Sequence, residues 1–413
     1  MRRFITGSIE LSDDYSINIS QLVNEALKEI YGGDTQPVNP RLFDITNNAI
    51  QNAFSVEFDT NGWGQGNPEF VDEFRTNGAV FAAFKNHQQT KDIVALLTDE
   101  NGNQRSFYEF KKLALQVSED YNVRYLQTEY NTATRSARAA INFRNYLKNE
   151  KVYPNLEYLE SMASHKREAH LHYVGTVLPI RHAWWDTHMP PSGWNCQCRV
   201  RPSRKQPTEV PTDELVPPVF ANNPGSSAKF IKTEETPYYK NTDADLRQQI
   251  EDLAKRAERI RQQLEELELK RRVFKSGGYI DVPKTGQNKN EEKENLSVYG
   301  LLAKKYGEKY ALVTPDNASG MKTPDAVNLK KYVYSDLKTQ TIGSVKNVIQ
   351  NGTKEASKQK ASEVVIKLVR PTSYKEVKDG LKATFQKNRN RGIKEVLIVY
   401  NDGSLRRYTQ PVF

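Results

Sequence analysis

Two aspartates and a lysine lie close together between Thr323 and Thr339, a segment whose strand-forming residues predict a β-hairpin. Asp325 stands where the first predicted strand begins, and Asp336 and Lys338 occupy alternate positions at the end of the second. Alternate residues of a strand point to the same face of a sheet. We therefore expect the side chains of Asp336 and Lys338 to converge on one point, with Asp325 beside them.

These side chains suit metal-dependent cleavage of a phosphodiester. Carboxylate oxygens are ligands that Mg²⁺ prefers, so Asp325 and Asp336 are the expected ligands of the ion. A bound metal polarises the phosphate and helps to generate hydroxide, while Lys338 can orient the attacking water or stabilise developing negative charge. The alternative is a solvated hairpin with ordinary surface charges, and the three residues alone leave both interpretations open.

The spacing of Pro-Asp, ten residues and Asp-Leu-Lys resembles the PD-(D/E)XK nuclease signature. Residues 290–413 read as helix, strand, strand, strand, helix, strand, helix, strand, strand. With the motifs LLAKKYG, KTPDAV, DLKT and ASKQ, this order resembles the C-terminal tRNA-nuclease domain of contact-dependent inhibition toxins. The resemblance implies an α/β domain with a mixed central sheet. It also implies a catalytic set of Glu294, Asp325, Asp336 and Lys338, with Gln359 nearby and Glu291 or Glu292 as alternatives to Glu294.

A second group of reactive side chains lies between residues 153 and 202, a stretch dense in proline, glycine and tryptophan. It holds most of the histidines and both cysteines of the chain. Zn²⁺ prefers such ligands, and the candidates are His170, His172, Cys196 and Cys198. The alternative is a compact turn whose thiols pack or form hydrogen bonds, because Cys-x-Cys is a less usual zinc spacing than Cys-x-x-Cys.

This stretch resembles the C-terminal signature of the phage Mu protein F-like head morphogenesis family. The matching residues, in order, are Arg167, His170, Gly175, Trp184 or Trp185, Pro190, Pro191, Trp194, Cys196 and Cys198. The upstream TEYNTATRSARAA also looks like that family, and the resemblance covers about residues 75–202. One departure is that Ala163, Ser164 and His165 stand where the family has an acidic residue before the Arg-x-x-His pair.

Charge is distributed unevenly along the 413 residues, whose formal net charge is +9. Residues 275–413 hold 26 lysines and arginines against 14 acidic residues, and the rest of the chain holds 34 against 37. A basic C-terminal part fits a polyanionic substrate, although a solubilising surface has the same composition. No apolar run approaches 18 residues, so we expect no transmembrane helix, and two cysteines exclude a disulfide-built secreted framework.

The pattern along the chain predicts a multi-domain protein. A long helix is expected over residues 243–273, because apolar residues from Leu246 to Leu267 alternate steps of four and three as in a coiled coil. Ser276–Gly278 is expected to be a hinge. The predicted regions are an N-terminal helical or irregular region (1–74), a mainly α-helical head-morphogenesis module with a small irregular Pro/Trp/Cys-rich unit (75–202), a linker (203–240), the heptad helix (241–274) and the α/β domain (275–413).

Two functions of different class are compatible with this organisation. The first is a phage minor head protein that carries a nuclease toxin, most simply one that cleaves tRNA or other RNA. The second is a purely structural minor capsid protein whose basic C-terminal domain binds packaged DNA. The two carboxylates favour the nuclease, because they would repel phosphate unless a metal lay between. The expected partners are portal and capsid proteins, nucleic acid and an immunity protein but no membrane, and the expected location is the virion and the host cytoplasm.

Overall fold

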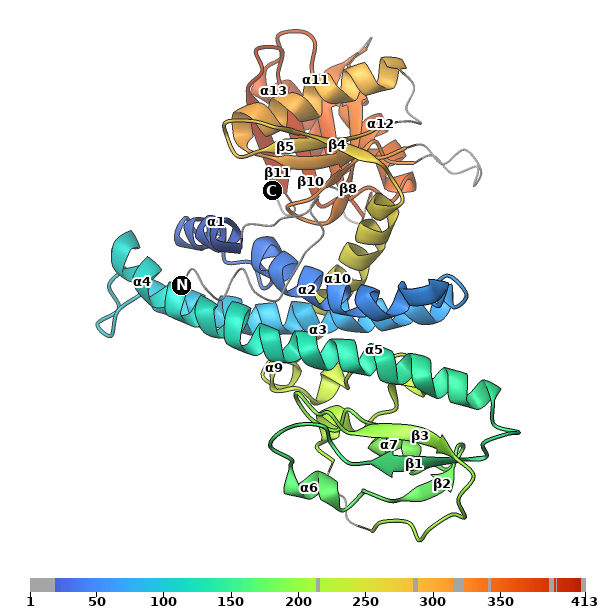
Figure 1. Cartoon of the computed structure of the whole chain (residues 1–413). Helices are drawn as coiled ribbons and strands as arrows, with labels where there is room; N and C mark the ends of the chain where they lie inside the picture. The colour runs from blue at the N-terminus through green and yellow to red at the C-terminus, as the bar shows by residue number, and fades with distance from the viewer. Residues whose placement is uncertain are drawn as a thin grey trace. The chain divides into compact units, whose positions relative to one another are not determined.

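The computed structural model describes residues 19–212, 216–284, 289–314, 323–340, 343–385, 390 and 392–409. The chain divides into two compact units, Met1–Glu258 and Arg259–Phe413. Helices dominate the first unit, and the second is organised around a large sheet (Figure 1). None of the helices in the described ranges is long and apolar enough to cross a lipid bilayer.

The N-terminal part of the first unit consists of helices α1 (Ile19–Tyr31), α2 (Pro40–Phe58), α3 (Pro68–Val94), α4 (Phe107–Glu119) and α5 (Leu126–Lys148). Asn39 caps α2, and Ser106 forms a capping box with Glu109 at the start of α4. A π-helical segment, Asp120–Tyr125, joins α4 to α5. The predicted boundary between residues 74 and 75 is wrong, because α3 runs through it as one continuous helix.

Small residues allow these helices to approach closely. A Cβ atom at Gly78 of α3 would lie 2.5 Å from the ring of Phe54 on α2. A stripe of small residues on α5 is buried, with Ala133, Ala137 and Ala140 fully excluded from solvent. The three alanines belong to the same apolar core as Phe54, so close helix contact is what the stripe provides.

The segment 203–240 is not the linker that its composition predicts. It contains short helical turns, namely η5 (Pro218–Phe220), α8 (Pro224–Ser227), η6 (Thr233–Glu235) and α9 (Pro237–Lys240). Phe220, Phe230 and Ile231 are buried in the core that α2, α3 and α5 share. The prolines and asparagines that suggest a flexible chain instead start and cap these turns, as Asn223 does by accepting the Gly225 N–H.

The Pro/Trp/Cys-rich region, predicted to be irregular, contains an antiparallel sheet of order β2-β1-β3. Its strands are β1 (Asn155–Leu159), β2 (Val177–Pro179) and β3 (Arg199–Ser203), and its single-turn helices are α6 (Glu168–Leu171) and α7 (Trp185–His188). Tyr158, Tyr173 and Trp185 are fully buried between these elements. Strands of three to five residues are too short for period-two alternation to be visible in the sequence.

Helix α10 (Ala244–Glu265) ends nine residues before the predicted end of the heptad helix at 274. The heptad positions Ile250, Ala257 and Ile260 are buried. Beyond the helix, β4 (Leu269–Val273) pairs antiparallel with β5 (Tyr279–Pro283), and the predicted hinge is the turn of this hairpin. The heptad spacing predicted too long a helix, because it ends at Leu267. Leu267 and Leu269 are instead spaced two residues apart, as in a strand. The predicted boundary between 274 and 275 is therefore wrong too.

The described part of the second unit holds a mixed eight-stranded sheet of order β11-β10-β9-β8-β7-β6-β5-β4. The strands after β5 are β6 (Lys309–Leu312), β7 (Ala326–Asn328), β8 (Val333–Thr339), β9 (Glu363–Lys367), β10 (Glu395–Val399) and β11 (Leu405–Thr409). Strands β8, β9 and β10 are parallel, while β7 and β11 run antiparallel to their neighbours. The mixed sheet predicted for this part of the chain is confirmed.

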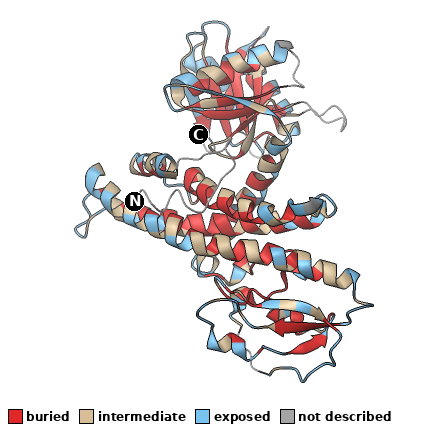
Figure 2. Ribbon diagram, viewed as in Figure 1, coloured by how far each residue is buried: buried red, intermediate tan, exposed pale blue. Residues whose placement is uncertain are grey.

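Helices cover both faces of this sheet (Figure 1). Helices α12 (Val345–Lys358) and α13 (Tyr374–Thr384) pack on the face that bears Val364 and Ile366. Helix α11 (Lys289–Tyr306) packs on the opposite face, which bears Val365 and Leu397. The central strands are thus buried on both sides (Figure 2), which explains their nearly continuous apolar sequences.

Candidate functional site

The structure brings the predicted Asp336 and Lys338 together on β8. In register, Asp336 lies beside Val364 and Lys338 beside Ile366, so both side chains share the sheet face that α12 covers. The Lys338 Nζ lies 2.9 Å from the Asp336 Oδ2, and the Asp336 side chain is only 2% exposed. Lys338 is half-buried, and its amine therefore reaches the carboxylate from the margin of the packed face.

Asp325 joins this pair from the adjacent strand. It directly precedes β7, which pairs with β8, and its Oδ2 accepts a hydrogen bond of 2.7 Å from the Leu337 N–H. This bond fixes the carboxylate next to β8. The Asp325 and Asp336 carboxylates are close enough to interact directly. Two acids and one base that are eleven and two residues apart in sequence therefore meet at one point.

Helix α12 supplies the fourth member of the cluster and the space for it. Gln359, its C-cap residue, places its side-chain amide against Asp336, and the amide nitrogen lies 2.8 and 3.0 Å from the two carboxylate oxygens to which it donates. Two turns earlier, a methyl group at Gly352 would lie 3.0 Å from Lys338 Cγ. Glycine at this position leaves room for the Lys338 side chain under the helix.

Burial makes Asp336 an unusual carboxyl group. Removal from water raises its pKa to about 7, and the charge of Asp325 pushes in the same direction, while Lys338 opposes both. The carboxyl therefore changes protonation near neutral pH. In its ionised form it presents, with Asp325, a pair of oxygen donors to a hard cation.

Glu294 is the predicted member of this cluster that no described contact joins to it, so its membership stays a prediction. It is exposed on α11, the helix that covers the opposite face of the sheet from Asp336. Glu291, the first alternative, is also exposed, and Glu292 is partly exposed. Among the described residues, no hydrogen bond or ion pair joins any of the three to Asp336. Helix α11 turns its buried residues Val298, Tyr299 and Leu302 toward the sheet, and the three glutamates lie in the turns before them.

The sequence patterns did not identify one buried acidic residue of the second unit. Glu363 is fully buried at the start of β9, where it accepts hydrogen bonds from Tyr310 Oη at 2.9 Å and from Asn328 Nδ2 at 2.8 Å. Burial raises its pKa to about 7, and Lys331 opposes that shift. Its position at the start of the apolar run EVVIK is the sequence feature that could have indicated a buried acid. It lies on the sheet face of Val365, away from Asp336.

In the first unit, three of the four predicted zinc ligands lie together. The Nδ1 of His170 is 3.6 Å from Cys196 Sγ and 3.5 Å from Cys198 Sγ, and all three side chains are buried. His172 is not a member of the group, because it is exposed. His170 lies on the single-turn helix α6 and His172 caps it, and residues two apart on a helix point in different directions.

The two thiols differ in character. The pKa of Cys196 is lowered to about 4, mainly because the Cys198 thiol donates to its sulfur, with further donors in His170 and the backbone N–H groups of Cys198 and Ser192. The pKa of Cys198 is raised, mainly by the same contact with Cys196. The contact between the two sulfurs therefore favours the ionised form of Cys196 and the protonated form of Cys198.

Known proteins match each unit separately. Residues 103–201 match the family model described as Phage Mu protein F like protein. The curated Escherichia phage Mu protein named "Putative capsid assembly protein F" is 37% identical to the chain over 78 residues. That similarity covers 19% of this chain and 18% of the phage Mu protein, so the chain spans less than a fifth of that relative.

Residues 322–405 match the family model described as Contact-dependent growth inhibition CdiA C-terminal domain. A solved structure, the CdiA-CT/CdiI toxin and immunity complex from Burkholderia pseudomallei, aligns with 31% of this chain and 92% of its own, at 18% identity and a TM-score of 0.23. The chain thus carries a phage Mu protein F-like segment in its first unit and a CdiA C-terminal-like segment in its second.

Proposed function

We propose that the second unit is a metal-dependent nuclease that acts as a toxin. The observation that supports this most directly is the meeting of Asp325, Asp336 and Lys338 at one point of the sheet. All three residues lie within the segment that resembles the CdiA C-terminal domain. A solvated hairpin with ordinary surface charges does not account for an aspartate that is almost fully buried.

The donor set fits Mg²⁺. Two adjacent carboxylates, one of them buried, carry a negative charge that a divalent cation would balance, and Mg²⁺ is commonly bound through one or two carboxylates with its other positions held by water and phosphate. Asp325 and Asp336 would hold the ion. When bound, it would supply polarisation of the phosphate and a more acidic water.

The chain's own residues have separate roles in this proposal. The Leu337 N–H orients the carboxylate of Asp325, and the Gln359 amide orients that of Asp336. Lys338 stabilises the negative charge that develops on the phosphate, because its amine stands at the partly exposed edge of the cluster. A role for Glu294 stays a prediction, because no described contact joins it to these groups.

RNA, and tRNA in particular, is the substrate we propose on the basis of the toxin resemblance. The charge of the C-terminal part supports a nucleic acid, since residues 275–413 hold 26 basic against 14 acidic residues. Exposed cations also lie on both edge strands of the sheet, with Lys270 and Arg272 on β4 and Arg406 on β11. An active nuclease of this kind would require an immunity protein in the cell that makes it.

For the first unit we propose a role in phage head assembly, with portal or capsid proteins as partners and the virion as its location. The similarity to the phage Mu capsid assembly protein supports this role.

The alternative for the whole chain is a structural protein whose basic unit binds packaged DNA. The buried carboxylate cluster favours the nuclease, because binding alone has no use for it.

The test is cleavage by the purified full chain of total tRNA and of plasmid DNA, in Mg²⁺ or in EDTA. We expect Mg²⁺-dependent cleavage of tRNA. Asp325→Ala and Asp336→Ala should each reduce it at least about 100-fold, because they remove metal ligands. Lys338→Met should reduce turnover by a similar factor while leaving Mg²⁺ affinity within about threefold of the wild type.

Matched controls lie on α12, close to the cluster but outside it. Glu355 and Lys358 are exposed, so Glu355→Gln and Lys358→Met remove the same charges without touching Asp336. Both variants should retain cleavage within about twofold. Cleavage by Asp336→Ala at the wild-type rate would refute the nuclease assignment, and the basic unit would then be interpreted as a DNA-binding arm.

A further inference from the structure

The cluster of His170, Cys196 and Cys198 has no role in the proposed nuclease, and it belongs to the other unit. Its three ligand atoms, one nitrogen and two sulfurs, lie within 4.8 Å of one another. We propose that they bind a single Zn²⁺ through His170 Nδ1, Cys196 Sγ and Cys198 Sγ. The inference is independent of the proposed function.

The distances fit a tetrahedral site. With Zn–S bonds of about 2.3 Å, Zn–N bonds of about 2.0–2.1 Å and tetrahedral angles, a sulfur and a nitrogen on one ion are separated by roughly 3.5–3.6 Å. The two observed separations between His170 Nδ1 and the cysteine sulfurs are 3.6 and 3.5 Å. The side chains therefore already stand where a zinc ion would hold them.

Hydrogen bonds alone explain this arrangement less well. A neutral histidine has one donor and one acceptor, on different ring nitrogens, so Nδ1 offers a single bond. Here two sulfurs approach that same nitrogen at nearly equal distance. A cation between the three atoms satisfies all of them at once. Two thiolates and a neutral imidazole are moreover a set of ligands that Zn²⁺ takes in proteins.

The surrounding chain fixes the two cysteines from outside. Arg167 donates from Nη2 to the Trp194 carbonyl at 2.5 Å, and a Cβ atom at Gly193 would lie 2.2 Å from the Arg167 guanidinium. Asn195, directly before Cys196, has a left-handed φ of 58°, and its N–H donates to Thr132 Oγ1 at 2.9 Å. The loop is thus held on both sides in the conformation that turns both thiols toward His170.

Two buried hydroxyls beside the thiols support the same conclusion. Tyr158 and Ser192 are completely buried, and within the described residues neither Tyr158 Oη nor Ser192 Oγ has a hydrogen-bond partner of good geometry. Tyr158 lies next to both Ser192 and Cys198. Since the described chain offers three ligands, a water molecule in the fourth position of the ion would give these hydroxyls a partner.

The expected role of the ion is to stabilise the small sheet of the first unit. It would join α6 to the segment just before β3, across a separation of more than 25 residues. The strands here have only three to five residues, and metal binding commonly supplies part of the folding free energy of so small a structure.

The test begins with the metal content of the full chain after expression in zinc-supplemented medium. We expect one zinc per chain. After the metal is removed, Co²⁺ should restore binding and give the absorption bands of a tetrahedral site with thiolate ligands, a readout that needs no variant. Cys196→Ser, Cys198→Ser and His170→Gln should each lower the zinc content at least about tenfold.

His172→Gln is the matched control, because His172 is exposed only two residues from His170. It should keep one zinc per chain. Asp336→Asn should keep it as well, which separates this site from the proposed Mg²⁺ site. A wild-type chain that holds less than about one zinc in ten molecules and shows no thiolate bands with Co²⁺ would overturn the proposal. Equal loss of zinc in His172→Gln would also overturn it.

Discussion

At the scale of single residues, the cost of burying charge connects the candidate site to stability. Asp336 and Glu363 lie on opposite faces of the same sheet, and both are nearly or fully buried. Desolvation raises the pKa of each to about 7. A structural core would avoid two such groups, so their retention at the centre of the second unit needs a reason. For Asp336 the proposed Mg²⁺ site supplies one, and for Glu363 the hydrogen bonds from Tyr310 and Asn328 do.

These shifts predict how the stability of the second unit depends on pH. Unfolded Asp and Glu have pKa values of about 3.9 and 4.3, whereas the folded values are about 7. Between these limits the folded form binds more protons, so the free energy of unfolding falls as pH rises, by at most about 1.4 kcal/mol per pH unit for each group. Hydrogen exchange measures this change in the free energy of unfolding. It would be followed in peptides from β9 and β10 of the full chain between pH 5 and 8, without divalent cations and with correction for the intrinsic exchange rate.

Asp336→Asn should weaken this dependence, because it removes one of the two groups, while Glu355→Gln on the exposed side of α12 should not. Addition of Mg²⁺ should restore protection above pH 7 in the wild type and in Glu355→Gln but not in Asp336→Asn, since binding to the folded state stabilises it. Corrected protection that does not change with pH would show that Asp336 and Glu363 keep ordinary pKa values.

At the scale of elements, α12 and β8 form the site through one close contact. Lys338 passes under α12 at Gly352, where a methyl group would lie 3.0 Å from Lys338 Cγ and 3.2 Å from Ile366 Cδ1. Glycine inside a helix ordinarily costs about 0.5–1 kcal/mol relative to alanine. The helix therefore gives up intrinsic stability at the position where the candidate catalytic lysine needs space.

We predict that Gly352→Ala reduces nuclease turnover at least about tenfold while the free energy of unfolding changes by less than about 1 kcal/mol. The gain in helix propensity and the displacement of Lys338 oppose each other in stability, but only the displacement affects the site. Single-turnover cleavage and urea unfolding of the same protein separate the two quantities.

Gly300 on α11 is the control, because a Cβ atom there would meet nothing within 4 Å beyond the adjacent backbone of its own helix. Gly300→Ala should stabilise the protein by about 0.5–1 kcal/mol and leave turnover unchanged. If Gly352→Ala behaved in the same way, Lys338 would not depend on the space under α12.

The elements also show what the sequence could and could not predict. Strands β9 and β10 were found because their apolar runs are buried on both faces, and Asp336 and Lys338 were placed together by strand alternation. Strand β4 was missed because its LKRRV sequence is an exposed edge with no apolar pattern. The place of Glu294 could not be predicted from the sequence, because a family motif does not say which side of α11 faces the sheet.

At the scale of the whole molecule, the division inside α10 separates two units that have different chemistry. The first holds the cysteine and histidine cluster, and the second holds the carboxylate and lysine cluster. The family matches respect the same division, since residues 103–201 lie in the first unit and 322–405 in the second. Each activity should therefore be testable by changes that leave the other unit intact.

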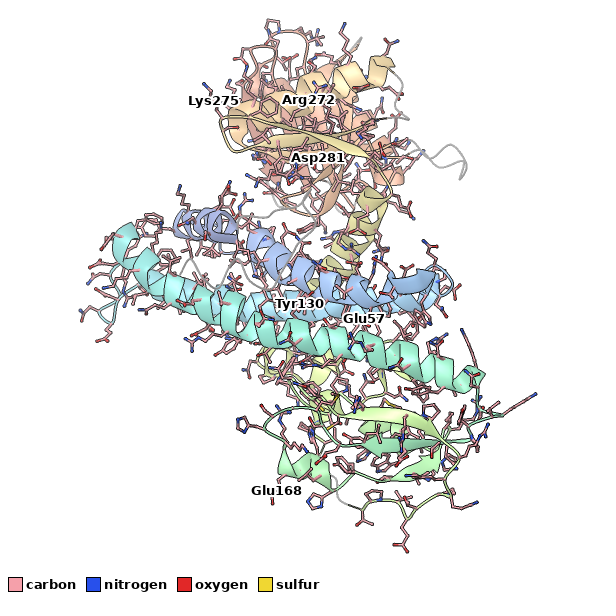
Figure 3. All side chains as sticks on the ribbon, viewed as in Figure 1. Glu57, Tyr130, Glu168, Arg272, Lys275 and Asp281 are labelled. Atoms are coloured by element: carbon pink, nitrogen blue, oxygen red, sulfur yellow. The ribbon has the colours of Figure 1, made fainter. Side chains whose placement is uncertain are left out.

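The position of the division also matters, because the hairpin of β4 and β5 belongs to the second unit. Arg271 on β4 makes two hydrogen bonds of 2.7 and 2.8 Å to Asp281 on β5, whose side chain is only 4% exposed. Figure 3 labels Asp281 on this hairpin together with Arg272 of β4. Upstream of the hairpin, Gln263 accepts a hydrogen bond of 2.7 Å from Tyr334 on β8.

We therefore predict that a fragment of residues 259–413 folds cooperatively and that one of residues 275–413 is less stable by on the order of 3 kcal/mol. The shorter fragment loses the ladder to β5 and the partner of Asp281. It also exposes the edge of β5, whose apolar residues favour association with other chains. Urea unfolding and sedimentation of the two fragments measure both effects.

Arg271→Met in the longer fragment isolates the ion pair and should account for part of the loss without causing association. Equal unfolding midpoints for the two fragments would mean that β4 contributes nothing to the second unit and that it begins after the hairpin turn.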